Sequence, residues 1–235
     1  MTKKRVYSHI LLDRSHSMHQ GYDDTVKAVN SYLEKLAADP DLSTRVSLTL
    51  FDSMSGISSG MLGTFGSHSS LATDHVFENI KPKTAPKIGR HNYQPRGNTP
   101  LFDAIGSVVA KIDAQTRREG EIVTLVVVTD GEENCSVLHT KESIRALLDA
   151  RKERGWLVIY LGADHDAFAQ AGSINVAAVN TMAYNKLNTE SATTATLRSV
   201  KDYAMTGSIA ASAFTNEERD KASGWAPNTA SGGAK

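Results

Sequence analysis

The sequence contains only one cysteine, Cys135, so no disulfide can form within the chain. This excludes the disulfide framework that stabilises many small secreted proteins. A single free cysteine suits a reducing compartment, and the cytoplasm is therefore the expected location.

The sequence also lacks an excess of either charge and any long apolar run. Its 26 Lys and Arg residues balance 26 Asp and Glu residues, which gives a formal net charge of zero. Without a concentration of positive charge, neither a nucleic acid nor an anionic membrane is an expected partner. The first apolar run is interrupted by Ser8, His9 and Asp13, unlike a signal-peptide core, and no later run is long enough to span a bilayer.

What the sequence does contain is an alternation of strand-like and helix-like segments. Apolar runs at 6–13, 45–51, 122–129 and 156–161 are typical of strands. Apolar residues recur at helical spacing after residue 23, over 101–112 and around 144–148. This order predicts an α/β fold with a Rossmann-like, mostly parallel central sheet and helices on both faces.

The less regular segments predict the edges of the fold. Runs at 45–51 and 57–65, joined by a Ser/Gly-rich turn, predict a hairpin that adds one antiparallel edge strand. Residues 73–98 predict mostly loop with a short helix near Phe77, and 174–179 a last strand. We expect one α/β domain over 1–180, a helical extension over 181–222, and a tail over 223–235 that has little to bury and is disordered.

Three polar clusters lie at the expected ends of strands or before a helix. In an open parallel sheet, ligands bind beyond the carboxyl ends of the strands. If the strands that end at Asp13 and Asp130 are neighbours, their carboxylates share one crevice and repel each other unless a cation lies between them. The clusters are Asp13-Arg14-Ser15-His16-Ser17, Asn98-Thr99-Pro100 and Thr129-Asp130-Gly131.

These clusters combine carboxylate and hydroxyl oxygens, which are hard ligands. Such donors favour Mg2+ or Mn2+, whereas zinc prefers imidazole and thiolate groups. We therefore predict one divalent cation site, with Mg2+ as the first choice and Mn2+ or Ca2+ as alternatives. Its predicted ligands are Asp13, Ser15, Ser17, Thr99 and Asp130.

Each cluster also has an ordinary structural interpretation. Asp13, Ser15 and Ser17 are common turn residues, and Thr99 can cap a helix that starts at Pro100. An Asp-Gly pair at 130–131 is a frequent turn. The presence of all three clusters in the right order favours the metal site over these separate readings.

The three clusters together resemble the von Willebrand factor type A family. The resemblance rests on Asp13-x-Ser15-x-Ser17, on Thr99 before Pro100, and on Asp130 before Gly131. All five positions of that family's metal-ion-dependent adhesion site (MIDAS) match. The order of elements is similar over 6–179, and the segment from 162 is similar to stand-alone bacterial and phage members.

The resemblance implies how such a site works. Ser15, Ser17 and Thr99 would touch the metal, while Asp13 and Asp130 would act directly or through water. One coordination position would be open to an Asp or Glu of another protein, such as an AAA+ ATPase or a component of a stress or defence system. Four neighbouring residues are expected to form the partner-binding rim: Arg14, His16, Arg96 and Glu132.

The leading hypothesis is a non-enzymatic module that binds another protein through the metal, because the ligand set is complete and no nucleophile–base pair accompanies it. One alternative is a hydrolase whose cation activates water toward a phosphoester. A phosphatase-like use of Asp13 would want a second acid at position 15, which is Ser15. Another alternative is a structural protein whose segment 180–222 pairs subunits, while the metal stabilises the fold.

Overall fold

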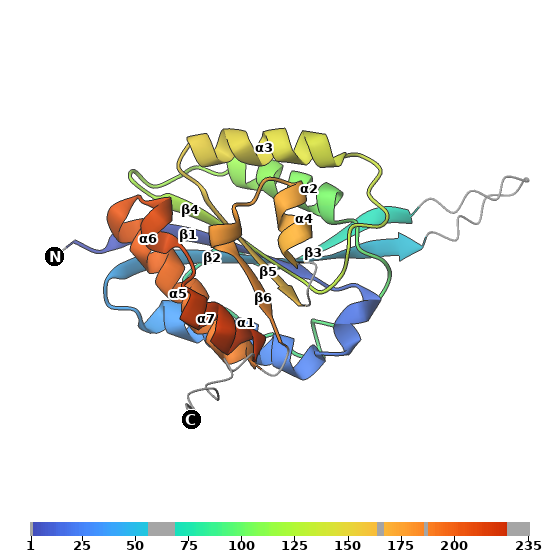
Figure 1. Cartoon of the computed structure of the whole chain (residues 1–235), viewed down its shortest axis with the longest axis horizontal. Helices are drawn as coiled ribbons and strands as arrows, with labels where there is room; N and C mark the ends of the chain where they lie inside the picture. Colours follow the sequence, from blue (N-terminus) through green and yellow to red (C-terminus); the bar gives the residue numbers. More distant parts are fainter. Residues whose placement is uncertain (1, 56–68, 164–166, 186–187, 225–235) are drawn as a thin grey trace, which may run out of the picture.

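The computed structural model describes residues 2–55, 69–163, 167–185 and 188–224. These residues form a six-stranded sheet in the order β3-β2-β1-β4-β5-β6, shown in Figure 1. All neighbouring pairs are parallel except β2 and β3, which confirms the predicted sheet with one antiparallel edge. The strands are β1 (Lys4–Asp13), β2 (Leu42–Ser55), β3 (Ser69–Ile80), β4 (Ile122–Thr129), β5 (Leu157–Ala163) and β6 (Thr181–Tyr184).

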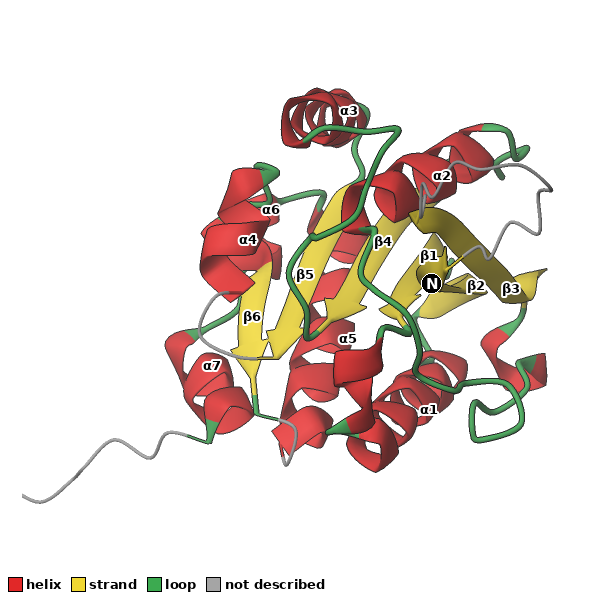
Figure 2. Ribbon diagram, turned by 90° about the vertical axis from the view of Figure 1, so that its right-hand side faces the viewer, coloured by secondary structure: helices red, strands yellow, loops and turns green. Residues whose placement is uncertain are grey.

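Helices cover both faces of this sheet (Figures 1 and 2). One face carries α2 (Leu101–Asp113), α3 (Lys141–Glu153) and α4 (Ala167–Ser173). The other carries α1 (Tyr22–Ala38), α5 (Thr189–Thr206) and α7 (Asn216–Ser223), and α6 (Ile209–Ser212) follows α5. Short 3-10 helices are η1 (His16–His19), η2 (Pro82–Thr84) and η3 (Ala178–Asn180). None of the described helices has the length and apolar character needed to cross a bilayer.

The central strand β1 is buried on both faces because its apolar residues serve two cores. Tyr7 and Leu11 pack in the core beneath α2 and α3. Val6, Ile10 and Leu12 pack in the core beneath α1 and α5. This double burial explains the continuous apolar run in the sequence and places Asp13, the last residue of β1, at the middle of the sheet's carboxyl edge.

The antiparallel edge strand is β3, and its position corrects the sequence prediction. The short helix predicted near Phe77 is wrong, because Phe77 is buried within β3. The strand predicted at 57–65 lies outside the described residues. The sequence signal for β3 is weak because Asp74 and Glu78 are exposed on this edge and the register with β2 shifts near Leu48.

The last strand also differs from its predicted place. The prediction of a strand at 174–179 is wrong, because Asn175 has a left-handed φ of 61° and the strand β6 begins at Thr181. Ile174 and Val176 are buried against the core beneath α3 and α4, which accounts for their apolar character. The boundary expected at residue 180 falls just before β6, so the sheet and its core continue into α5.

An arginine of α7 binds the backbone at the start of β6 and just before it. The Arg219 guanidinium donates to the carbonyl oxygens of Ala178 at 2.7 Å and Val179 at 3.2 Å, and also to that of Thr181. These acceptors lie at or beside the last strand of the sheet. Their hydrogen-bonding capacity is therefore used within the chain.

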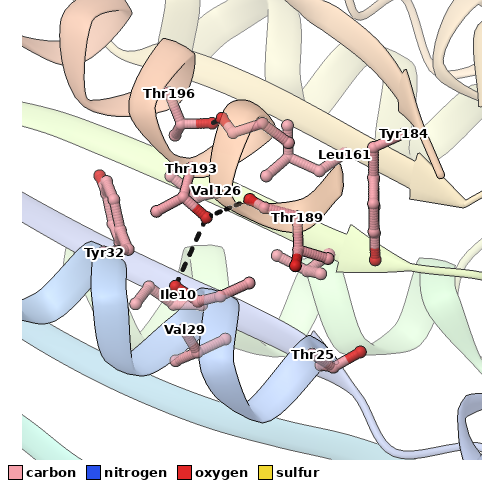
Figure 3. A pocket seen from close by; sticks show the side chains of 13 residues that line it. Ile10, Thr25, Val29, Tyr32, Val126, Leu161, Tyr184, Thr189, Thr193 and Thr196 are labelled. Atoms are coloured by element: carbon pink, nitrogen blue, oxygen red, sulfur yellow. Dashed lines mark hydrogen bonds between the residues drawn. The ribbon is translucent and has the colours of Figure 1, made fainter. Parts of the chain in front are cut away.

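The packing of α5 against α1 relies on small side chains and leaves a cavity of about 30 Å3 (Figure 3). Thr193 and Thr196 donate their hydroxyls to carbonyl oxygens one turn earlier in α5, at 2.7 and 2.8 Å. The threonines therefore satisfy their hydroxyls within α5 while they line the cavity, where Ile10 and Val29 lie opposite. This helix is thus packed with few large apolar contacts.

We expect Leu48→Ala to lower the free energy of unfolding by about 2–5 kcal/mol, because truncation of a packed leucine leaves a cavity. Leu48 lies in β2 with 0 % of its surface exposed. Leu138, which is 77 % exposed, provides the matched control, and Leu138→Ala should change the value by less than about 0.5 kcal/mol. Equilibrium urea unfolding measures both. Equal losses would contradict this assignment of the core.

Candidate metal centre

The two aspartates predicted to share a crevice do emerge from neighbouring strands. The strands β1 and β4 are parallel, and Leu12 of β1 lies opposite Val128 of β4. Asp13 ends β1 and Asp130 follows directly after β4, so both leave the same edge of the sheet. The sheet order therefore brings together two clusters that are more than a hundred residues apart.

The Asp13 carboxylate is buried and fixed in place by hydrogen bonds to both of its oxygens. The backbone N–H of Ser15 donates to Oδ1 at 2.6 Å, and the Thr129 hydroxyl donates to Oδ2 at 2.5 Å. The buried Tyr93 hydroxyl donates to the Asp13 carbonyl oxygen at 3.0 Å. These contacts tie the end of β1 to β4 and to the loop before α2.

The hydroxyls of the first cluster lead from this buried carboxylate to the surface. Ser15 Oγ and Ser17 Oγ lie 3.0 Å apart and share a hydrogen bond. Ser17 Oγ donates to Asp130 Oδ1 at 2.6 Å. Ser15 is buried and Ser17, in η1, is exposed, so the row of oxygens is open to solvent at one end.

The last predicted ligand, Thr99, lies in the loop before α2. Its backbone is paired with Asn134, through Thr99 N–H to Asn134 Oδ1 at 3.0 Å and Asn134 N–H to Thr99 O at 3.3 Å. A Cβ placed on Gly131 would lie 2.9 Å from Thr99 Oγ1, 3.4 Å from Ser17 Oγ and 3.7 Å from Asp13 Oδ2. Oxygens from the first two clusters therefore border one small space beside Gly131 of the third cluster, and a side chain at position 131 would enter this space.

The electrostatics of this space suit a cation. Burial raises the pKa of the Asp13 carboxyl from 3.8 to about 6, and the nearby charge of Asp130 acts in the same direction. Hydrogen bonds from Thr129 and Ser15 lower this pKa but do not cancel the effect of burial. A cation held between the carboxylates would favour their ionised forms.

The donor set fits a hard divalent cation. It consists of two carboxylates and three hydroxyls, which match the ligands of Mg2+ or Mn2+. In the part of the chain that the structure describes, no cluster of three or more His, Cys, Asp or Glu side chains is suited to a metal. The candidate site therefore depends on its serines and threonine as much as on its acids.

The residues predicted to form the rim do not all lie there. His16 and Glu132 are exposed beside the site, and Arg96 is also exposed on the loop before Thr99. Arg14 differs from the prediction, because its side chain is buried and forms ion pairs with carboxylates of β2 and β3. The guanidinium is held inward by these carboxylates, of which that of Asp52 is fully buried.

The loop between β4 and α3 is held against α2 by two acids. Asp103 accepts hydrogen bonds from the backbone N–H groups of Val137 at 2.9 Å and His139 at 2.8 Å. Glu133 accepts from the Phe102 N–H at 2.8 Å. Sequence reasoning assigned no role to the residues that support the ligand loops, which are Tyr93, Asp103, Thr129, Glu133 and Asn134. Of these, only Thr129, Glu133 and Asn134 could have been suspected from the sequence, because they lie within four residues of the predicted ligand Asp130.

Comparison with known proteins agrees with this architecture. The sequence pattern of the von Willebrand factor type A domain matches residues 9–206. The structure of proximal thread matrix protein 1 from the mussel byssus has a TM-score of 0.59 at 12% identity, covering 82% of this chain and 47% of that chain. A second structure of that protein, with a zinc-occupied MIDAS motif, has a TM-score of 0.58 at 14% identity, covering 86% and 48%.

A bacterial adhesin has a similar fold. The open conformation of the pilus adhesin SpaC from Lactobacillus rhamnosus GG has a TM-score of 0.59 at 14% identity, covering 87% of this chain and 30% of that chain. Identities this low show a common fold alone, and the chain spans about half or less of the length of these proteins. No curated protein matches the chain.

We expect Gly131→Ala to abolish binding of Mg2+ and leave the fold intact, because the added methyl group would fill the space bordered by Thr99, Ser17 and Asp13. Gly172→Ala is the matched control, since a Cβ there meets no atom within 4 Å. Isothermal titration with Mg2+ measures the affinity, and circular dichroism checks the fold. An unchanged affinity in the Gly131 variant would exclude this space as the metal site.

We expect metal-free Asp13→Asn to be more stable than the wild type at pH 8, by about 2–3 kcal/mol. Because the Asp13 pKa is raised, the folded wild type holds a proton between about pH 4 and 6 that the unfolded chain has released. Wild-type stability therefore falls as pH rises through this range, and the variant lacks this loss. The Thr129 hydroxyl can then donate to Gly131 O, 3.2 Å away.

Urea unfolding in EDTA between pH 4 and 8 measures this difference. The two proteins should differ little at pH 4, and the gap should open as the pH approaches 6. Parallel pH profiles would show that Asp13 is ionised in the folded protein throughout the range.

Proposed function

Because this chain belongs to the von Willebrand factor type A domain family, we propose that it is a non-enzymatic module that binds another protein through a divalent cation. The observation that carries the proposal is the convergence of Asp13, Ser17 and Thr99 oxygens on the space beside Gly131. The proposed ligands are those of the MIDAS: Asp13, Ser15, Ser17, Thr99 and Asp130.

Mg2+ is the proposed ion, with Mn2+ or Ca2+ as alternatives. Hydroxyl and carboxylate oxygens are the donors that Mg2+ accepts, and Mg2+ is usually held by few protein groups, with water at its other coordination positions. When bound, it supplies an electrophilic position that attracts a carboxylate. Exposed Ser17 and partly exposed Asp130 support access to this position from solvent.

The proposed partner offers an Asp or Glu side chain to the metal. His16 and Arg96, exposed on two adjacent ligand loops, would favour an acidic segment, and Glu132 would select against a second acid close to itself. The family resemblance suggests an AAA+ ATPase or a component of a stress or defence system. The lone Cys135 suits a cytoplasmic partner.

The hydrogen bonds of the serines support binding rather than catalysis. Ser15 Oγ and Ser17 Oγ bond to each other, and Ser17 Oγ also bonds to Asp130. Among the described residues, neither hydroxyl is hydrogen-bonded to an imidazole that would act as a general base. A hydroxyl placed between carboxylates is better suited to donate electron pairs to a cation.

We expect the wild-type protein used as bait to retain a partner in Mg2+ and to lose it in EDTA. Gly131→Ala bait in Mg2+ is the matched control, because it preserves charge and surface while the metal space is filled. Quantitative mass spectrometry of the retained proteins compares the three conditions. A partner set that is the same in all three would exclude metal-dependent binding.

The same preparation separates the module from a hydrolase. Turnover of a generic phosphoester by the Mg2+-loaded wild type, lost in Gly131→Ala, would replace the proposed function with metal-assisted hydrolysis. Retention of a partner without turnover supports the binding function.

A further inference from the structure

We propose that Asp52 is a positioning residue for the metal site, because its buried carboxylate joins the two loops that carry Ser15, Ser17 and Thr99. The inference rests on the proposed metal-binding function. It assigns to a residue outside the five ligands the role of holding the ligand loops at the spacing the ion needs.

The carboxylate of Asp52 is shared by two guanidinium groups. Arg14 Nε donates to Asp52 Oδ2 at 3.0 Å, and Arg96 Nε donates to the same oxygen at 2.6 Å. The Asp52 side chain is 0 % exposed, the Arg14 side chain 5 % and the Arg96 side chain 55 %. One oxygen atom therefore links the loop after β1 to the loop before α2.

The two arginines belong to the ligand loops themselves. Arg14 lies between Asp13 and Ser15, and Arg96 lies three residues before Thr99. The Arg96 N–H also donates to the Arg14 carbonyl oxygen at 2.6 Å. A change in the distance between the two guanidinium groups would therefore be transmitted to the hydroxyls at the metal space.

The surrounding backbone leaves little freedom for other arrangements. Gly97 has a φ of 67°, and a Cβ there would lie 2.3 Å from the Ser53 carbonyl oxygen, so the loop is pressed against the end of β2. The His16 N–H donates to the Gly97 carbonyl oxygen at 3.1 Å. Asp52 lies where these three segments meet, beside Ser53.

The charge balance at this point makes the role of Asp52 testable. Arg14 also forms an ion pair with Asp74, which is 59 % exposed and belongs to β3. The positive charges of Arg14 and Arg96 are thus matched by the negative charges of Asp52 and Asp74. Loss of Asp52 would leave a buried Arg14 with one exposed partner. The Arg14 and Arg96 guanidinium groups would then repel each other without a shared carboxylate, which would shift the loops against the backbone hydrogen bonds that join them.

Arg96→Gln distinguishes positioning from simple charge. Removal of a positive charge near a cation site should tighten cation binding if charge alone matters. If the bridge through Asp52 positions the ligands, the same substitution should weaken binding, by about tenfold, as is typical when groups that orient metal ligands are lost. The Arg96 side chain is half exposed, so the variant retains the buried Arg14–Asp52 pair and its fold.

The experiment titrates Mn2+ alone into the full-length protein and measures free Mn2+ by electron paramagnetic resonance. The variants are Arg96→Gln, Asp52→Asn and Asp74→Asn, each checked by circular dichroism and thermal unfolding. We expect about tenfold weaker binding for Arg96→Gln and at least tenfold for Asp52→Asn. Asp74→Asn makes the same charge change as Asp52→Asn but breaks no link between the loops, so its affinity should fall by less than about threefold.

Several outcomes would overturn the inference. Unchanged or tighter Mn2+ binding by folded Arg96→Gln would refute positioning, and so would equal losses in Asp52→Asn and Asp74→Asn. If Asp52→Asn does not fold, Arg96→Gln still decides. Absence of Mn2+ binding by the wild type would instead refute the proposed metal-binding function itself, so the two failures are distinguishable.

Discussion

The site depends on one carboxylate that is buried at the centre of the sheet's edge. Asp13 ends the middle strand, and both faces of that strand are covered by helices, so its side chain has no direct access to solvent. Hydrogen bonds from Thr129 and Ser15 satisfy its oxygens, yet burial still raises its pKa. A bound cation would offset the free-energy cost of burying the ionised Asp13 carboxylate. The surrounding loops bring further oxygens to the same space.

Much of this arrangement could be predicted from the sequence because it depends on local patterns. The apolar run of β1 and the polar residues directly after it fix the position of Asp13, Ser15 and Ser17. The run of β4 does the same for Asp130. Parallel strands place their carboxyl ends together, so short-range patterns were enough to bring these residues to one edge. Thr99 required the family resemblance as well as its place before Pro100.

The parts that could not be predicted depend on contacts between distant residues. The edge strand β3 is polar on its exposed side, and its pairing with β2 rather than its own pattern makes it a strand. Arg14 looked like a rim residue, and only the position of Asp52 on β2 shows that it turns inward. Tyr93 reaches Asp13 across 80 residues of sequence. Periodicity carries no information about such partners.

The two ends of the sheet have a consequence for association between molecules. A free strand edge is a template for another chain, and the edge strands of the described sheet are β3 and β6. At one end, Arg219 of α7 donates to the Thr181 carbonyl oxygen, at the start of β6. At the other end, Asp74 and Glu78 of β3 form ion pairs with Arg14 and Lys111, and both acidic side chains remain partly exposed. Both ends of the described sheet thus carry charged side chains, which are among the features that disfavour strand addition.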